Sequence, residues 1–133
     1  WAYCPQSILE NVQRIRTPFN ANSAAMKAAA AAIKDIEYIA MVREHTAKWQ
    51  KIISERVTEM GIKILPSVTN FYLLDFAENE NKSGADAAAF LESKGIIPRP
   101  AGSNSNTGYV RITVGLDDEN EAVLKALAEY MSN

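Results

Sequence analysis

The sequence is poor in the residues that disulfides, metal sites and membrane spans require. Its 133 residues include one cysteine, Cys4, and one histidine, His45. A single cysteine excludes a disulfide within the chain and fits a reducing compartment, and one Cys with one His argues against an all-protein zinc site. No run approaches the roughly 18 apolar residues of a membrane span. We therefore expect a cytoplasmic protein without a metal centre.

An excess of charge of either sign is also missing. Lys and Arg total 14 against 16 Asp and Glu, which gives a net charge of −2, and 47% of residues are hydrophobic. This balance lacks the basic footprint of a nucleic-acid-binding or membrane-binding protein. The length fits a single domain. Because the chain opens on Trp1 without an initiator methionine or a cap signal, we expect residues 1–133 to be a fragment of a longer protein.

The chain carries no recognisable catalytic constellation. There is no glycine-rich phosphate loop between a strand and a helix, and no nucleophile elbow. His45 lies in a helical stretch without a nameable nucleophile or base partner, so we interpret it as a solvated or structural histidine. Cys4 is interpreted as a small buried hydrophobe rather than a thiolate.

The clearest pattern is a strand over residues 108–115. Apolar Val110, Ile112 and Val114 alternate with polar residues, which predicts a half-buried strand. Arg111 then stands in mid-strand on the face opposite the core. An unpaired cation there is costly where water is scarce, so Arg111 requires either a carboxylate of the chain or an anionic ligand.

Residues 1–60 are expected to be a mainly helical lead-in. One helix starts after Pro5, and an alanine-rich helix starts after an Asn22 or Ser23 cap. The second helix should bend or pause near residues 38–41, and the sequence leaves open whether residues 23–60 form one kinked helix or two. Val42, Trp49, Ile53, Val57 and Met60 fall on one apolar face, and Gly61 provides the C-terminal stop.

Residues 61–133 have the order β-β-α-β-β-α. The expected strands cover residues 62–65, 70–76, 96–97 and 108–115. Ser83 should cap the intervening helix, with Gly95 ending it, and Asp117 should cap the last one. This order predicts an α+β fold in which helices cover a small, mostly antiparallel sheet.

Two further polar residues occupy unusual positions. Arg99 follows a short apolar run, and if its strand pairs with that of Arg111, both guanidinium groups lie beside one cleft. Two fixed cations suit bidentate binding of carboxylate or phosphate; structural salt bridging is the alternative. Asn70 stands at the start of an apolar strand, where it either serves the site or bonds a neighbouring loop.

Four motifs in register resemble one enzyme family. They are RTPFNAN at 16–22, PSVTNFYL at 66–73, GIIPR at 95–99, and VRITVG at 110–115 followed by Glu119-Asn120. Together they resemble the C-terminal part of histidinol-phosphate aminotransferase, a fold-type I enzyme that uses pyridoxal phosphate, and the resemblance covers essentially the whole chain. It implies that the chain is the small domain of such an enzyme.

The resemblance also implies residue roles. Arg111 matches the family arginine that holds the substrate's α-carboxylate or equivalent anion, and Arg99 the arginine that helps to bind the phosphate of histidinol phosphate. Asn70, Asn20 and Asn22 match positions close to the active site. The lysine that binds pyridoxal phosphate belongs to the large domain of such enzymes, so the fragment alone is expected to be inactive, and the full-length protein a homodimer.

The expected function is therefore transamination of histidinol phosphate with 2-oxoglutarate, in histidine biosynthesis. One departure keeps alternatives open, because many relatives carry an aromatic residue and Gly-Leu between the two arginines, where this chain has a Ser/Asn-rich loop at 101–107. An aromatic or other amino-acid aminotransferase, or a related decarboxylase of phosphorylated amino acids, is one alternative. A non-catalytic α+β module that binds a small anion is the other.

Overall fold

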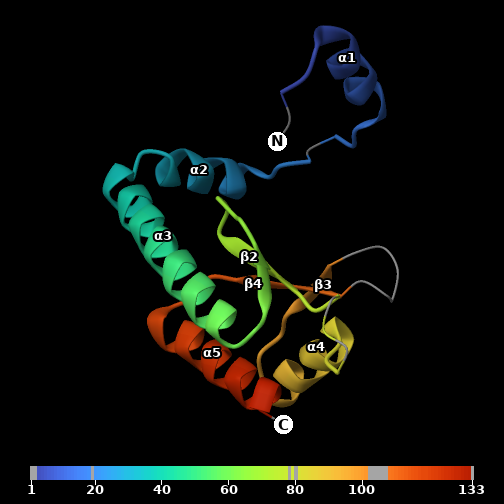
Figure 1. Ribbon diagram of the computed structural model, residues 1–133. Coiled ribbons are helices and arrows are strands. Elements are labelled where there is room, and N and C mark those ends of the chain that lie inside the picture. The colour runs from blue at the N-terminus through green and yellow to red at the C-terminus, as the bar shows by residue number, and fades with distance from the viewer. Residues whose placement is uncertain (1–2, 19, 78, 80, 102–107, 133) are drawn as a thin grey trace. The chain divides into compact units, whose positions relative to one another are not determined.

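The computed structural model describes residues 3–18, 20–77, 79, 81–101 and 108–132. It divides into two compact units, Trp1–Ala40 and Met41–Asn133. Figure 1 labels the helices and strands along the chain. The Ser/Asn loop singled out in the sequence lies, except for Ala101, outside the described residues.

The first unit contains two short helices. Helix α1, Gln6–Ile15, starts directly after Pro5 as predicted. Helix α2, Ser23–Ala32, has Asn22 as its N-cap, because the Asn22 Oδ1 atom accepts a hydrogen bond of 2.8 Å from the Ala25 N–H. Of the two predicted caps, Asn22 is the one used. Neither helix has a buried residue.

Helix α3, Ile36–Glu59, begins in the first unit and ends in the second. The predicted break near residues 38–41 is wrong in position, since the chain leaves helical geometry just before Ile36. The Asp35 carboxylate causes the new start by accepting the Tyr38 N–H at 3.0 Å. Residues 23–59 therefore form two helices. Gly61, with φ of +77°, ends the second one as predicted.

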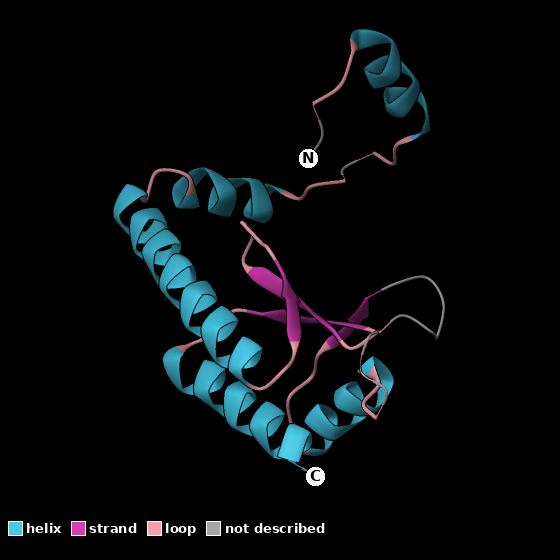
Figure 2. Cartoon of the chain, viewed as in Figure 1, coloured by secondary structure: helices cyan, strands magenta, loops and turns pink. Residues whose placement is uncertain are grey.

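A four-stranded antiparallel sheet forms the centre of the second unit (Figure 2). Its spatial order is β1-β2-β4-β3, from β1, Lys63–Leu65, and β2, Phe71–Asp75, to β4, Tyr109–Thr113, and β3, Arg99–Ala101. The predicted strand at 96–97 is wrong. The Ile96 N–H instead bonds the Leu91 carbonyl and completes the end of the preceding helix, and pairing starts only at Arg99.

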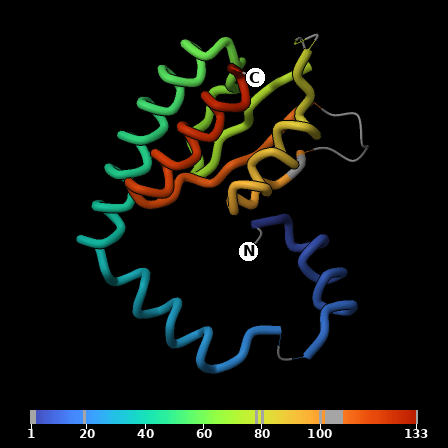
Figure 3. The backbone as a smooth tube through the Cα atoms, turned by 90° about the horizontal axis from the view of Figure 1, so that it is seen from below, coloured from blue at the N-terminus to red at the C-terminus, as the bar shows by residue number. Residues whose placement is uncertain are grey.

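Three helices cover one face of this sheet. Figure 3 shows α3, α5 and α4 side by side across it; α4 is Gly84–Ser93 and α5 is Asp117–Ser132. The core lies between the two layers. Its largest fully buried side chains are Tyr72, Ile53, Leu74, Leu91, Leu124, Leu127, Val57, Val110 and Asn120. The predicted α+β fold is confirmed.

The predicted caps and apolar faces of the helices are confirmed only in part. The Ser83 cap is confirmed, because its hydroxyl accepts the Asp86 N–H at 3.0 Å. Trp49 and Ile53 on the predicted apolar face of α3 are buried, but Val42 is exposed. The predicted Asp117 cap is wrong, because Asp117 is the first residue of α5. Its carboxylate instead accepts a hydrogen bond from the indole N–H of Trp49.

Candidate functional site

Arg99 and Arg111 are directly opposite each other on neighbouring antiparallel strands. Val110 and Ile112, which flank Arg111, are buried against the helices, so alternation places Arg111 on the uncovered face of the sheet. Opposed residues share a face, and their Cβ atoms lie about 4.5–5.5 Å apart. The strand pairing therefore brings the two predicted arginines side by side.

Neither guanidinium forms an ion pair with a carboxylate among the residues that the structure describes. Arg111 packs instead on the ring of Phe71, with Cζ 5.0 Å from the ring centroid. Two like charges placed directly opposite each other destabilise a sheet. The salt-bridge alternative raised by the sequence is not observed in these ranges, and an anion from outside would relieve the repulsion.

A cavity of about 580 Å³ adjoins the two arginines. It lies between the end of α4, the segment that leads to β3, the end of β4 and the first turns of α5. Besides the arginines, its polar lining residues are Lys94, Thr113, Glu119 and Asn120. Lys94 is paired with Glu129 at 2.6 Å, so the charge balance of the lining rests on the two arginines against the Glu119 carboxylate. This net positive charge favours a negatively charged ligand of small-molecule size.

The other predicted site residues do not line this cavity. Asn70 is exposed just before β2, where its backbone carbonyl accepts the Val114 N–H at 2.9 Å. Asn20 and Asn22 lie in the first unit; the Asn20 side chain accepts a hydrogen bond from Arg16, and Asn22 caps α2. Their proximity to the active site stays a prediction.

Comparison with known proteins identifies the family. The model of the family "Aminotransferase class I and II" matches residues 1–127. The chain belongs to this family. Histidinol-phosphate aminotransferase of Rhodopseudomonas palustris (strain HaA2) is 41% identical over 132 residues, which are 99% of this chain and 36% of the relative. The chain of this aminotransferase-family protein thus spans about a third of the length of its relative, and the resemblance read from its four motifs is confirmed.

Solved aminotransferase structures share the fold. Histidinol-phosphate aminotransferase from Clostridium acetobutylicum matches with a TM-score of 0.80 and 25% identity, over 96% of this chain and 39% of that one. The enzyme from Sinorhizobium meliloti, in complex with pyridoxal-5'-phosphate, matches with a TM-score of 0.74 and 26% identity, over 95% and 34% of the two chains.

Sequence reasoning missed the roles of two residues at this candidate site. The ring of Phe71 packs against the Arg111 guanidinium. Leu73 is opposite Arg111 in the sheet, and Phe71, two residues earlier on the same strand, lies on the same face as Leu73 and Arg111. Strand alternation could therefore have predicted this contact. Asn120 is only 1% exposed, and its side chain bonds both the N–H and the carbonyl of Gly115 at 2.9 Å. The sequence placed Asn120 in the fourth motif but did not indicate that its side chain holds both backbone groups of Gly115.

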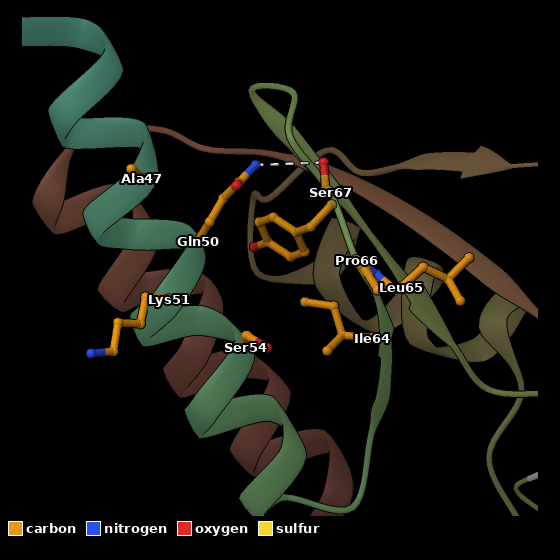
Figure 4. Close-up of a pocket in the computed structure, with 9 residues that line it drawn as sticks. Ala47, Gln50, Lys51, Ser54, Ile64, Leu65, Pro66 and Ser67 are labelled. Carbon is orange, nitrogen blue, oxygen red and sulfur yellow. Dashed lines mark hydrogen bonds between the residues drawn. The ribbon is translucent and has the colours of Figure 1, made fainter.

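A second cavity, of about 390 Å³, lies between α3 and the β1 edge of the sheet. Figure 4 shows Gln50 extending from the helix toward Ser67, with their side chains 3.5 Å apart. The hydroxyl of Tyr72, which also lines this cavity, is buried and has no hydrogen-bond partner. Burial raises the pKa of Tyr72 above its ordinary value, so this phenol stays neutral in the folded protein at physiological pH.

Metal binding and membrane insertion find no support in the described ranges. Within them, no three His, Cys, Asp or Glu side chains gather into a group that could hold a metal ion. None of their helices is both long and apolar enough to cross a membrane.

Proposed function

We propose that this chain is the C-terminal part of a pyridoxal-phosphate-dependent histidinol-phosphate aminotransferase. The full-length protein would transfer the amino group of histidinol phosphate to 2-oxoglutarate, a step of histidine biosynthesis. The observation that carries the proposal is the pair Arg99 and Arg111, opposed in register, without a carboxylate partner in the described ranges, and beside a cavity of about 580 Å³. Both substrates of this reaction are anions.

Each of the two arginines binds a different anionic group of the substrates. Arg111, held on the Phe71 ring, binds the carboxylate of 2-oxoglutarate, or the equivalent anionic group of the amino donor. Arg99, at the first position of β3, binds the phosphate of histidinol phosphate. A planar guanidinium forms two parallel hydrogen bonds to a carboxylate or phosphate and thereby fixes its orientation. Such orientation lowers the barrier by removing the cost of aligning the reactant during the reaction.

Pyridoxal phosphate supplies the electron sink that stabilises negative charge on the substrate's reacting carbon. We propose that residues outside this chain bind the cofactor, including the lysine that anchors it, and that residues 1–133 alone are therefore inactive. The chain's own contribution is the anion-binding face of β3 and β4. The lead-in of residues 1–60 and the small domain of residues 61–133 would belong to one protein that acts as a homodimer in the cytoplasm, with small molecules rather than nucleic acid or membrane as its partners.

A substrate panel on the full-length protein tests this function. With pyridoxal phosphate and 2-oxoglutarate present, histidinol phosphate should be preferred over phenylalanine and tyrosine as the amino donor. Preference for the aromatic amino acids would keep the role of Arg111 and remove the phosphate role of Arg99. Release of carbon dioxide from a phosphorylated amino acid would indicate a decarboxylase instead. No reaction with any donor would leave a small-anion-binding module.

A further inference from the structure

The end of β4 is fixed by side chains from two different helices. The Gly115 carbonyl accepts a hydrogen bond of 2.9 Å from the side chain of Asn120, on α5, and one of 2.8 Å from Nε2 of His45, on α3. The Gly115 N–H donates to Oδ1 of the same asparagine. His45 is 70 residues away in sequence, so this second bond is a tertiary connection.

The backbone groups of the Gly115 turn have hydrogen-bond partners even without His45. Asn120 already pairs with both backbone groups of Gly115, and the Glu119 carboxylate accepts the next N–H, that of Leu116, at 2.7 Å. A carbonyl oxygen has two lone pairs, and His45 uses the one that Asn120 leaves. Its bond therefore adds restraint against movement of the turn relative to α3.

A second ring on α3 repeats this connection one helical turn later. Trp49 donates its indole N–H to Asp117, and Nδ1 of His45 lies 3.9 Å from the same carboxylate. Positions four apart lie on the same face of a helix, so both rings reach residues 115–117 together. These rings therefore connect that turn to α3 within the second unit.

The same turn borders the cavity beside the arginines. Gly115, Glu119 and Asn120 line it together with Arg99 and Arg111. A side chain at residue 115 would disturb this arrangement, since a Cβ atom on Gly115 would lie 2.5 Å from Oε2 of Glu119. A shift of Gly115 would change the shape of the cavity and the end of the strand that carries Arg111.

We propose that His45 is a positioning residue for anion binding: by holding the Gly115 carbonyl, it fixes the cavity wall next to Arg111. The inference rests on the proposed function. Its matched variants are His45→Leu, which removes the ring N–H, and His45→Gln, whose terminal amide N–H reaches a similar distance. His45→Asn is one carbon too short and serves as a second loss variant if leucine impairs folding. Lys48→Ala is the control, because Lys48 is an exposed neighbour of Asp117 at 4.0 Å.

The test is steady-state kinetics of the full-length enzyme with pyridoxal phosphate. One hydrogen bond of about 1 kcal/mol corresponds to about a fivefold change, so His45→Leu and His45→Asn should raise KM for histidinol phosphate about fivefold and change kcat less than about twofold. His45→Gln and Lys48→Ala should stay within about twofold of the parent. A purely structural histidine would lower the melting temperature without raising KM selectively, and glutamine would not restore KM. The proposal is overturned if KM and kcat change together, or if His45→Gln behaves like His45→Leu.

A double-mutant cycle separates an effect through Arg111 from an independent one. If His45 acts by positioning the wall beside Arg111, the combined KM increase of His45→Leu with Arg111→Lys should be smaller than the product of the two single increases. Multiplicative effects would contradict the coupling.

Failure of the proposed substrate is distinguishable from failure of the positioning role. If the parent does not transaminate histidinol phosphate, inorganic phosphate becomes the probe, and the readout is the rise in melting temperature of the full-length protein. A rise in the parent that His45→Leu diminishes supports positioning at an anion site with another substrate. Equal rises in both proteins reject the role of His45, and no rise in the parent rejects the role together with the anion site.

Discussion

Replacement of Arg111 by alanine should impair function strongly and leave stability nearly unchanged. Truncating one partner of a bound charge pair costs about 2–4 kcal/mol, so kcat/KM of the full-length enzyme should fall by about 30-fold to about 900-fold. Under the proposed function, the loss should fall on the anionic substrate that Arg111 binds. The magnitude is that of a direct contact between Arg111, which lines the cavity, and the substrate.

The stability terms for the same substitution have opposite signs. Removing Arg111 relieves its repulsion with Arg99, the residue directly opposite. Because Arg99 is exposed, water screens the pair, and two charges about 6 Å apart in water repel each other by about 0.7 kcal/mol. It also removes the cation–π contact with Phe71, a loss of about 0.5–1 kcal/mol. The free energy of unfolding without substrate should therefore change by less than about 1 kcal/mol.

Two assays together decide the outcome: steady-state kinetics with both substrates, and thermal unfolding without them. Arg56→Ala is the matched control, because Arg56 has a carboxylate partner, Glu121, at 2.7 Å on the outer surface of the helices. The control should leave kcat/KM unchanged. An Arg111→Ala effect of less than about tenfold, which is about 1.4 kcal/mol, would refute direct substrate binding. A large drop in melting temperature would show that Arg111 stabilises the sheet instead.

Three further predictions test the site and the core. Arg99→Ala should reduce kcat/KM for phosphorylated amino donors at least about tenfold more than for unphosphorylated ones; equal losses would contradict phosphate binding. Leu74→Ala should lower the free energy of unfolding by about 2–5 kcal/mol, because Leu74 is 0% exposed, whereas Val68→Ala, at a fully exposed side chain, should change it little; similar effects in denaturant titrations would place the core elsewhere. The pKa of Tyr72 is raised by burial, so the folded state keeps a proton that the unfolded chain releases, and stability should decrease as pH rises above about 10. Tyr72→Phe should reduce that decrease and cost no stability near pH 7, because the hydroxyl has no partner; a clear loss of stability near neutral pH would mean that the hydroxyl is bonded.

Much of the fold could be predicted because it depends on local rules. Alternation of Val110 and Ile112 with Arg111 predicted a half-buried strand and the face on which the arginine stands, and the structure has both. Ser83 fitted the pattern of an N-cap and Gly61 that of a C-terminal stop, and each has that role. These signals involve residues a few positions apart, so the backbone and one side chain are enough to satisfy them.

Two of the errors concern a carboxylate whose hydrogen-bond partner the sequence did not reveal. Near the start of α3, the alanine-rich sequence favoured continuation of the helix to residues 38–41, but the Asp35 carboxylate restarts the helix earlier by accepting the Tyr38 N–H. Asp117 fitted a cap, but its carboxylate bonds Trp49, 68 residues earlier. Which partner a carboxylate takes depends on what tertiary packing brings within reach.

By itself, the sequence determined the α+β fold, the cation in mid-strand and the four motifs of the aminotransferase family, because each is encoded in short-range spacing or in contiguous residues. Only the tertiary structure decided that Arg99 stands opposite Arg111, that neither has a carboxylate partner in the described ranges, and that His45 and Asn120 hold the turn beside them. Register between strands and contacts between distant helices follow from packing of the whole core, since a shift of one residue in pairing would move every side chain to the opposite face.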